Sequence, residues 1–294
     1  MLSYQHAYHA GNFADVHKHL TLFAVTDNLL RKKSPVTYID THAGRGLYPL
    51  SAEESSRLQE HLSGIVPLWQ ARSRINDPLA LEWLQTIAAA QEQEKGQKEA
   101  QGKEPNGASL SHYPGSPWWL AQRLRSQDRL RLFELHPGEH ARLAKQVLPA
   151  NTRHEYGDGL GGLLAMLPVA TPRLCVLIDP SYELKAEYRE VAEVVVQAMR
   201  KARHAIVLIW YPLLPAGQHH ELLESLRSSG LRKIWRSELH QRDPKQAERG
   251  MYGSGMLVVN PPWGVDTRLA DAMRELTPLL GEQCRYSADW WVEE

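Results

Sequence analysis

The segment that decides the fold reads Val176-Leu177-Ile178-Asp179-Pro180-Ser181-Tyr182. Its apolar residues predict a buried strand that ends in an acid, and Pro180 stiffens the turn that follows. The Asp179 carboxylate and the Tyr182 ring are therefore expected at one edge of a sheet. In an open α/β sheet, ligands bind outside the carboxyl ends of the strands. This edge is the candidate site.

The rest of the chain repeats the alternation of strand and helix. Short apolar or β-branched runs separated by helical patterns predict an α/β fold, one doubly wound domain over residues 1–294 with a mostly parallel, seven-stranded sheet. The predicted strands are Val36 to Asp40, Arg129 to Glu134, Arg153 to Tyr156, Arg173 to Asp179, Ala205 to Tyr211, Leu231 to Leu239 and Gly255 to Asn260.

One long segment interrupts this rhythm. Residues 47–110 open with helical apolar spacing and no strand as far as Ala90, which predicts an inserted helical subdomain. The stretch from Gln91 to Ser109 is rich in Gln, Glu, Lys and Gly, and it cannot bury enough apolar surface to offset its ordering entropy. We expect an exposed or mobile loop there, preceded at most by a frayed helix.

Composition excludes several classes of protein. The 34 basic and 34 acidic residues balance, which argues against a protein that coats nucleic acid but allows a local basic face. Two cysteines, Cys175 and Cys284, form no disulfide framework and no zinc cluster. No stretch approaches the roughly 18 apolar residues that span a bilayer. We expect a soluble cytoplasmic protein without a membrane partner, and a monomer.

Two further strand ends carry candidate ligand groups. The loop Asp40-Thr41-His42-Ala43-Gly44-Arg45-Gly46 has glycines two apart, which let a backbone approach a ligand closely, but it lacks the third glycine of the dinucleotide fingerprint. Glu134 ends the second strand, where its carboxylate can accept both ribose hydroxyls of a nucleoside. Taken alone, each feature is equally compatible with a turn that binds nothing.

The tetrapeptide Asp179-Pro180-Ser181-Tyr182 resembles the Asp-Pro-Pro-Tyr signature of amino-group methyltransferases that act on adenine. An adenine amino nitrogen is a poor nucleophile because its lone pair is delocalised into the ring. Asp179 and the Pro180 carbonyl can accept hydrogen bonds from its two N–H groups, and Tyr182 can stack on the extruded base. Ser181 departs from the signature, which removes rigidity but neither acceptor.

The N-terminus is rich in histidine and tyrosine. His17 and His19 are two residues apart, so a helix would point them to different faces, and no Cys or carboxylate cluster joins them. We therefore predict no metal site. Without further information, a solvated arm before a helix that starts near Asn12 would be the simplest interpretation.

This N-terminus and the later motifs together resemble the ribosomal RNA large subunit methyltransferase J family, which methylates adenine N6 in 23S ribosomal RNA. The motifs are residues 1–19, Asp40 to Gly46, Tyr113-Pro114-Gly115-Ser116-Pro117, Glu134-Leu135-His136-Pro137, Asp158-Gly159, the Asp179 tetrapeptide and Asn260-Pro261-Pro262-Trp263. The resemblance covers nearly the whole chain and implies a Rossmann-like fold that uses S-adenosyl-L-methionine (SAM).

The resemblance also implies a role for each matching residue. SAM would be bound by Lys18, His19, His42, Ser116, Glu134, Asp158 and Gly159, with Gly44 and Gly46 in the loop beside it. Ser116, placed before Pro117, is expected to cap a helix. Asp179 would be the catalytic acceptor, with Pro180 and Tyr182, while Tyr4 and His6 would meet the RNA.

Two alternatives stay open. A DNA adenine-N6 methyltransferase would use the same tetrapeptide, and a catalytically weakened, SAM-dependent RNA-binding protein would explain Ser181. Candidate phosphate contacts are Arg31-Lys32-Lys33, Arg72, Arg74 and Arg232-Lys233, although a solvated charged face explains any one of them better.

Overall fold

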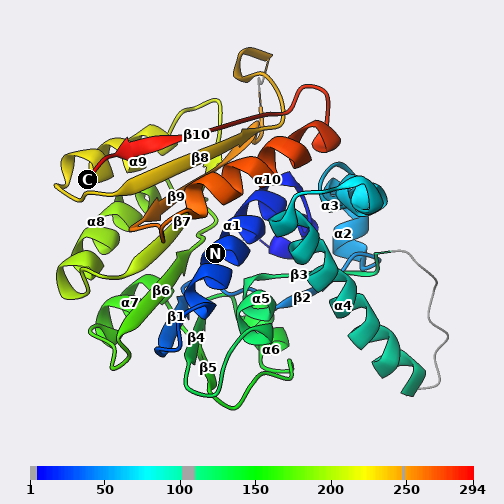
Figure 1. Cartoon of the computed structure of the whole chain (residues 1–294), viewed down its shortest axis with the longest axis horizontal. Coiled ribbons are helices and arrows are strands. Elements are labelled where there is room, and N and C mark those ends of the chain that lie inside the picture. The colour runs from blue at the N-terminus through cyan, green and yellow to red at the C-terminus, as the bar shows by residue number, and fades with distance from the viewer. Residues whose placement is uncertain (1–4, 101–109, 247–248) are drawn as a thin grey trace.

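The computed structural model describes residues 5–100, 110–246 and 249–294 (Figure 1). A central sheet has eight strands in the order β10-β8-β9-β7-β6-β1-β4-β5, one more than predicted. Its strands are Val36–Asp40 (β1), Arg129–Glu134 (β4), Thr152–Tyr156 (β5), Arg173–Ile178 (β6), Ile206–Leu213 (β7), Ile234–His240 (β8), Gly253–Val259 (β9) and Arg285–Val292 (β10). The strand that the sequence did not predict is β10, which pairs antiparallel with β8 at the sheet edge.

Most neighbouring strands run parallel, as predicted. β1, β4, β5, β6 and β7 share one direction. β9 lies between β7 and β8 and is antiparallel to both, so β8 runs in the same direction as β7. The carboxyl ends of six strands therefore meet at one end of the molecule.

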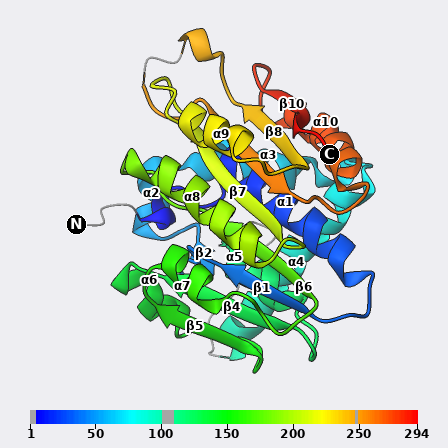
Figure 2. The same cartoon turned by 90° about the vertical axis from the view of Figure 1, so that its left-hand side faces the viewer.

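Helices cover both faces of the sheet (Figure 2). Gly159–Met166 (α7), Ala186–Lys201 (α8) and His219–Ser228 (α9) lie on one face, and Phe13–Leu30 (α1), Ser116–Gln122 (α5) and Val265–Leu280 (α10) lie on the other. A short helix, Pro137–Leu143 (α6), packs against β5 near the sheet edge. The two faces carry two separate apolar cores.

The segment 47–110 differs from its prediction in two respects. It opens with a short strand, Leu47–Pro49 (β2), which pairs with His112–Pro114 (β3). The last of its helices continues to Ala100, so residues 91–100 are helical rather than a loop, and residues 101–109 lie outside the described residues. These helices are Glu53–Leu58 (α2), Ile65–Ala71 (α3) and Pro78–Ala100 (α4).

Helices α3 and α4 share an apolar core with α1 and α10 instead of forming a core of their own, while α2 packs against the N-terminal 3-10 helix His6–Tyr8. The division at residues 47–110 therefore stays a prediction. Four short 3-10 helices complete the described elements: His6–Tyr8 (η1), Glu60–Ser63 (η2), Arg72–Arg74 (η3) and Pro244–Gln246 (η4).

Helix α1 is buried on nearly every side. The His17 ring contacts the hydroxyls of Ser237 (2.8 Å) and Ser254 (3.1 Å), while His19 faces away toward Tyr113. The two histidines thus point to different faces, as expected. Burial lowers the pKa of His17 to about 3, so the ring is neutral. Among the described helices, none is long and apolar enough to cross a membrane.

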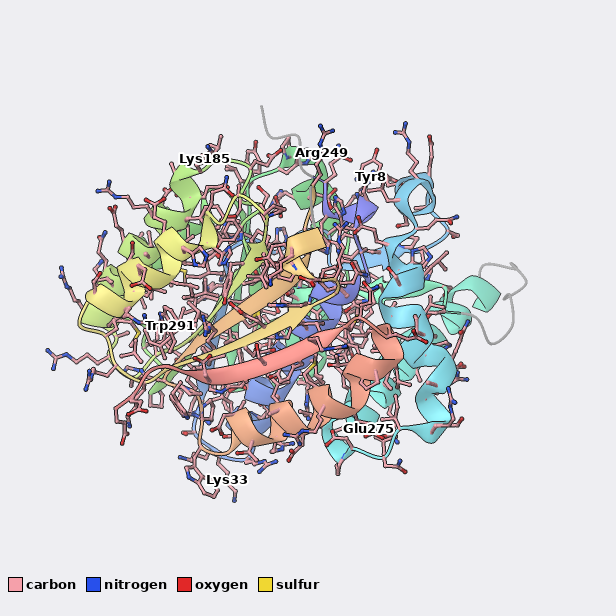
Figure 3. All side chains as sticks on the ribbon, turned by 90° about the horizontal axis from the view of Figure 1, so that it is seen from above. Tyr8, Lys33, Lys185, Arg249, Glu275 and Trp291 are labelled. Atoms are coloured by element: carbon pink, nitrogen blue, oxygen red, sulfur yellow. The ribbon has the colours of Figure 1, made fainter. Side chains whose placement is uncertain are left out.

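The shared strand direction gives the molecule two unlike ends. Tyr8 and Arg249 lie at the end where the parallel strands finish, and Lys33 lies at the opposite end (Figure 3). Asn12 caps α1 by accepting a hydrogen bond from the Asp15 amide (2.9 Å), which fixes the start of this helix at the first of these ends.

Candidate active site

A cavity of about 440 Å³ opens at the carboxyl ends of the parallel strands. Its walls come from the loops after β1, β4, β6 and β7 and from the first turns of α1. The predicted site residues that line it are His6, Lys18, His19, His42, Gly44, Ser116, Glu134, Asp158, Gly159, Asp179 and Pro180. The fold therefore brings together residues from six separate segments of the sequence.

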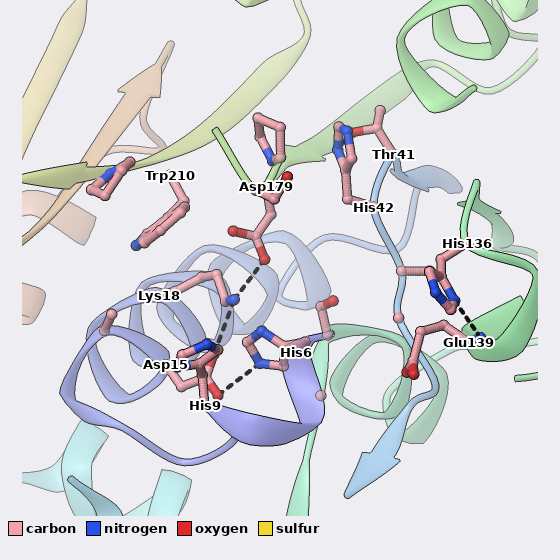
Figure 4. A pocket seen from close by; sticks show the side chains of 18 of the residues that line it. His6, His9, Asp15, Lys18, Thr41, His42, His136, Glu139, Asp179 and Trp210 are labelled. Atoms are coloured by element: carbon pink, nitrogen blue, oxygen red, sulfur yellow. Dashed lines mark hydrogen bonds and ion pairs between the residues drawn. The ribbon is translucent and has the colours of Figure 1, made fainter. Parts of the chain in front are cut away.

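A chain of charged contacts crosses the floor of the cavity (Figure 4). Lys18 Nζ lies 2.5 Å from Asp179 Oδ2 and 3.0 Å from Asp15 Oδ1. The other Asp15 oxygen, Oδ2, lies 2.9 Å from His6 Nε2 and accepts the Gly11 amide at 2.8 Å. The N-terminal turn is thus connected to the carboxylate that the sequence singles out.

The two carboxylates of this chain respond differently to burial. Burial raises the pKa of Asp179, and the Lys18 charge only partly offsets the rise. Burial also acts to raise the pKa of Asp15, but His6 and Lys18 outweigh it and hold the pKa well below its usual range. Asp15 is therefore a fixed negative charge, whereas Asp179 is the group of this pair that can gain a proton.

A third carboxylate lies beneath the cavity. Burial raises the pKa of Asp40 to about 7, although the Ser116 side chain and the His42 amide oppose the shift. Asp40 Oδ1 accepts that amide at 3.2 Å. Since a pKa near 7 allows protonation at neutral pH, Asp40 can reduce the negative charge around Asp179.

Glu134 is oriented by the backbone around it. Its Oε2 accepts the Gly44 amide (2.7 Å) and its Oε1 accepts the His136 amide (2.6 Å). Burial raises its pKa against the effect of these two bonds. Each carboxylate oxygen has a further lone pair, so the group can still accept hydroxyl donors from a ligand.

Two glycines let the backbone close around this half of the cavity. A Cβ on Gly159 would lie 2.0 Å from the Thr41 carbonyl oxygen, so the backbone here admits glycine alone. Gly44 has φ +62°, and a Cβ there would meet the Tyr48 hydroxyl at 2.2 Å. Asp158 caps α7 through the amides of Leu160 (3.1 Å) and Gly161 (2.9 Å).

Gly46 does not line the cavity. Its φ is +88° and its carbonyl accepts the Gly115 amide at 2.7 Å, so its part is to shape the loop. Gly115, not Ser116, occupies the N-cap position of α5, and Ser116 is the first helical residue. The capping prediction for Ser116 was therefore wrong by one residue, although its side chain does line the cavity.

The two histidines expected at the cofactor are neutral. Burial lowers the pKa of His19 well below its usual range, and its Nδ1 lies 2.9 Å from the Tyr113 hydroxyl. Burial lowers the pKa of His42 to about 4, against the opposing charge of Asp158. These rings offer hydrogen bonds rather than positive charge, which leaves Lys18 as the cation of this wall.

Tyr182 does not lie where its predicted stacking role requires. Its ring is buried and stacks on Tyr188 with centroids 4.2 Å apart, and its hydroxyl donates to the Trp210 carbonyl at 2.8 Å. Trp210 and Tyr48 line the cavity instead, and of the two Trp210 is the less buried. The Trp210 indole N–H is bonded to Ser254 (3.0 Å), and Lys18 Nζ lies 5.8 Å from its ring.

The sequence analysis missed Asp15 and Trp210, and it named Asp40 as the acid that ends the first strand without giving it a role. Asp15 resembles an ordinary first-turn acid, and Trp210 lies within an apolar run that reads as core. Tyr4 lies outside the described residues, so its predicted RNA contact stays a prediction. Among the described residues, no group of three or more His, Cys, Asp and Glu side chains is placed to hold a metal ion.

Comparison with known proteins adds to this geometry. Residues 33–292 match the family described as ribosomal RNA large subunit methyltransferase D, RlmJ. The chain belongs to this family. It is therefore a methyltransferase, and S-adenosyl-L-methionine is its cofactor.

Full-length relatives have similar sequences. Ribosomal RNA large subunit methyltransferase J of Haemophilus influenzae is 36% identical over all of this chain and 98% of its own length. The Escherichia coli protein of the same name is 35% identical, over 93% of this chain and 92% of its own. The crystal structure of protein LPL1258 from Legionella pneumophila superposes with a TM-score of 0.82 at 34% identity, covering 96% of this chain and 98% of the other.

The residues present fit this cofactor. A nucleoside with two ribose hydroxyls needs a carboxylate such as Glu134 and a backbone that can approach it, which Gly44 and Gly159 allow. The amino-acid end carries a carboxylate, and Lys18 is a buried cation on the same cavity.

Proposed function

We propose that this protein transfers a methyl group from S-adenosyl-L-methionine to the N6 amino group of an adenine in 23S ribosomal RNA. One observation carries the proposal. Asp179 directly follows β6 and lines the cavity, with Lys18 Nζ 2.5 Å from one of its oxygens and Pro180 beside it on the same wall. A carboxylate followed by a backbone carbonyl is the acceptor pair that an exocyclic amine requires.

The acceptor pair prepares the nucleophile. Asp179 accepts one amino N–H and the Pro180 carbonyl accepts the other, so the nitrogen leaves the ring plane and its lone pair becomes available. Lys18 orients the carboxylate and helps to keep it ionised. The cofactor, when bound, supplies an electrophilic methyl group with its leaving group in place, so positioning provides most of the rate.

The cofactor residues follow the wall of the cavity. Glu134 would hold the ribose, Asp158 and Gly159 would flank the adenine of the cofactor, and Lys18 with the neutral His19 and His42 would meet its amino-acid end. Ser116 and the turn from Gly44 to Gly46 would complete this wall. Each assignment is supported by the cavity position of these residues, apart from Gly46, which acts through the loop.

The target base has to leave its stack to reach Asp179. We assign the aromatic contact with the base to Trp210, because its ring lines the cavity while the Tyr182 ring is buried. Tyr182 is then a positioning residue that holds the Trp210 backbone. His6, on the same cavity, and Tyr4 would meet the RNA at the entrance.

The test is transfer of labelled methyl from the cofactor to protein-free large-subunit rRNA, followed by nucleoside analysis. We expect N6-methyladenosine with the wild type and none with Asp179→Ala. Label on duplex DNA but not on rRNA would replace the substrate with DNA. Cofactor binding without label on rRNA or on precursor particles would make the protein a binder whose activity Ser181 has weakened.

We also propose where and how the enzyme works. Its named relatives come from bacteria, in which ribosomal RNA is made in the cytoplasm, so we place it there. We propose a monomer that uses no metal ion, since the methyl donor needs no activation beyond its own charge.

A further inference from the structure

The end of the molecule opposite the active site is basic. Six strands of the sheet share one direction, so the loops that lead into them gather at one end. In these fully described loops, residues 31–35, 123–128, 144–151, 167–172, 202–205 and 229–233, the one carboxylate is Asp128, which is buried against Arg125. The basic residues of this end are Arg31, Lys32, Lys33, Arg123, Arg125, Arg129, Lys145, Arg173, Arg203, Arg232 and Lys233, and the acids that the adjoining elements place there are Asp27, Asp266, Glu293 and Glu294.

The opposite polarity holds at the cavity. Its walls carry Asp15, Glu134, Asp158 and Asp179, with Lys18 among them. The whole chain has no net charge. The surplus of positive charge at the far end therefore arises because the fold gathers basic residues there. A surplus of positive charge on one surface attracts a polyanion to it.

The centre of this surface is a turn whose backbone is held from behind. Arg125 donates to the Lys32 carbonyl (2.8 Å) and to the Ser34 carbonyl (3.1 Å). Arg173 donates to the same two carbonyls and to that of Leu29. The turn is thereby fixed, while the side chains of Lys32 and Lys33 remain exposed.

Several cations of this surface are not paired with a carboxylate among the described residues. Asp27 neutralises Arg31 and Glu294 neutralises Lys233. Lys32, Lys33 and Arg203 are exposed, and no ion pair with a carboxylate occupies them among the described residues. The loops of Arg203 and Lys233 converge, because Asn260 donates to the carbonyls of Arg203 (2.9 Å) and Lys233 (2.9 Å). Trp263, three residues after Asn260, accepts from Asn28 and so joins these loops to the end of α1 that leads into Lys32 and Lys33.

An exposed indole belongs to the same surface. Trp263 is 96% exposed, and its carbonyl accepts the Asn28 side chain at 3.3 Å, one turn before Arg31. A bare tryptophan beside lysines and arginines is the combination that binds single-stranded nucleic acid, through phosphate contacts and stacking on an unpaired base. An acidic protein would use the charges but would leave the indole unexplained.

We propose that Lys32, Lys33, Arg203 and Trp263 form a second RNA-binding surface, which holds the phosphates and one unpaired base of the substrate RNA far from the reacting adenine. The inference rests on the proposed function, because it takes the RNA as substrate. Helix α1 runs from the cavity to this surface and its 18 residues span about 27 Å. Only an RNA long enough to bridge that distance can use both sites.

The test compares the salt dependence of binding to protein-free large-subunit rRNA for the wild type and for a triple variant, Lys32→Gln, Lys33→Gln and Arg203→Gln. Removing three phosphate contacts should make the negative slope of the log binding constant against log salt concentration less steep by about 2. Trp263→Ala should weaken binding about fivefold or more with an unchanged slope, since stacking releases no counterions. A matched control removes three exposed arginines elsewhere: Arg189→Gln, Arg274→Gln and Arg285→Gln.

Activity separates this inference from the proposed function. The triple variant should have a higher KM on rRNA and an unchanged kcat. Its KM on the shortest RNA fragment that the wild type still methylates should also be unchanged. Equal salt slopes for the wild type and triple variant, or an equal loss in the control, would overturn the second surface and leave the activity standing. Absence of RNA methylation by the wild type, with the slope difference present, would overturn the proposed activity alone.

Discussion

Replacement of Asp179 by Asn tests the centre of the proposed mechanism. The variant keeps the shape and one carbonyl acceptor but loses the negative charge. A hydrogen bond to a charged group contributes about 1.5–3 kcal/mol. If that bond acts on the amine as it gains positive charge, kcat should fall roughly 10- to 150-fold.

The structure indicates that this loss will not be caused by unfolding. In Asp179→Asn, Lys18 still lies 3.0 Å from Asp15 Oδ1, so its charge remains compensated. Lys18→Met is the contrasting variant, because it leaves two carboxylates without their shared cation. Breaking a buried pair in this way costs about 3–5 kcal/mol of the free energy of unfolding.

The pH profile adds a second readout. Because burial raises the pKa of Asp179, the carboxylate is protonated as the pH falls through that value, and methyl transfer should fall with it. Asp179→Asn should remove this acid limb, and Lys18→Met should move it to higher pH because the cation that opposes the rise is gone. Single-turnover methylation of rRNA between pH 5 and 9, with thermal unfolding of each variant, measures both effects. An unchanged kcat, or an acid limb that persists in Asp179→Asn, would refute the assignment.

Three further predictions concern positions around the site. Gly159→Ala should lower the free energy of unfolding by about 1–3 kcal/mol and weaken cofactor binding, because the new Cβ meets the Thr41 carbonyl. Gly157→Ala is the control, since the space around Gly157 is open, and it should change neither quantity. Urea unfolding and cofactor titration measure the two effects. The pKa of His17 is about 6.5 in the unfolded chain and about 3 in the folded protein, so the free energy of unfolding should drop by up to roughly 5 kcal/mol as the pH falls from the first value to the second. His17→Gln should make stability less dependent on pH. Parallel curves of stability against pH for the wild type and the variant would contradict this prediction. Tyr182→Phe should lower kcat with little change in the free energy of unfolding, because it removes the hydrogen bond to the Trp210 carbonyl but keeps the buried ring. If kcat and the unfolding curve were both unchanged, Tyr182 would have no positioning role.

The sequence predicts the helices and strands that have a strong apolar pattern. It misses strands that are too short to show a pattern or that form through pairing with a distant part of the chain. Strands β1 and β4 have the predicted bounds. β1 is a continuous apolar or β-branched run, β4 alternates arginine with leucine before Phe133, and both end in an acid. β10 was missed because its residues are mostly exposed on a sheet edge, where no alternation of apolar and polar side chains is required. β2 and β3 have three residues each, too few for any period to be visible.

The site shows the same division. Asp179 and Glu134 are found from sequence because a strand end determines where an acid will lie. The partners of Asp179 are not found in this way, since Lys18 and Asp15 reach it from a helix some 160 residues earlier in the chain. Tyr182 was misplaced because the motif specifies a ring but not the side to which it turns, and Tyr188 and the Trp210 carbonyl decide that.

The burial of α1 on all sides has a consequence for synthesis of the chain. This helix is synthesised before the elements that cover it, which include α4, α5, β7, β9 and α10, and the last of these ends at Leu280. During synthesis, the apolar side chains of α1 therefore stay exposed to solvent or bound to a chaperone until α10 has emerged from the ribosome. A protein shortened before α10 would retain every acid of the active site and still lack the cover that lets its first helix fold.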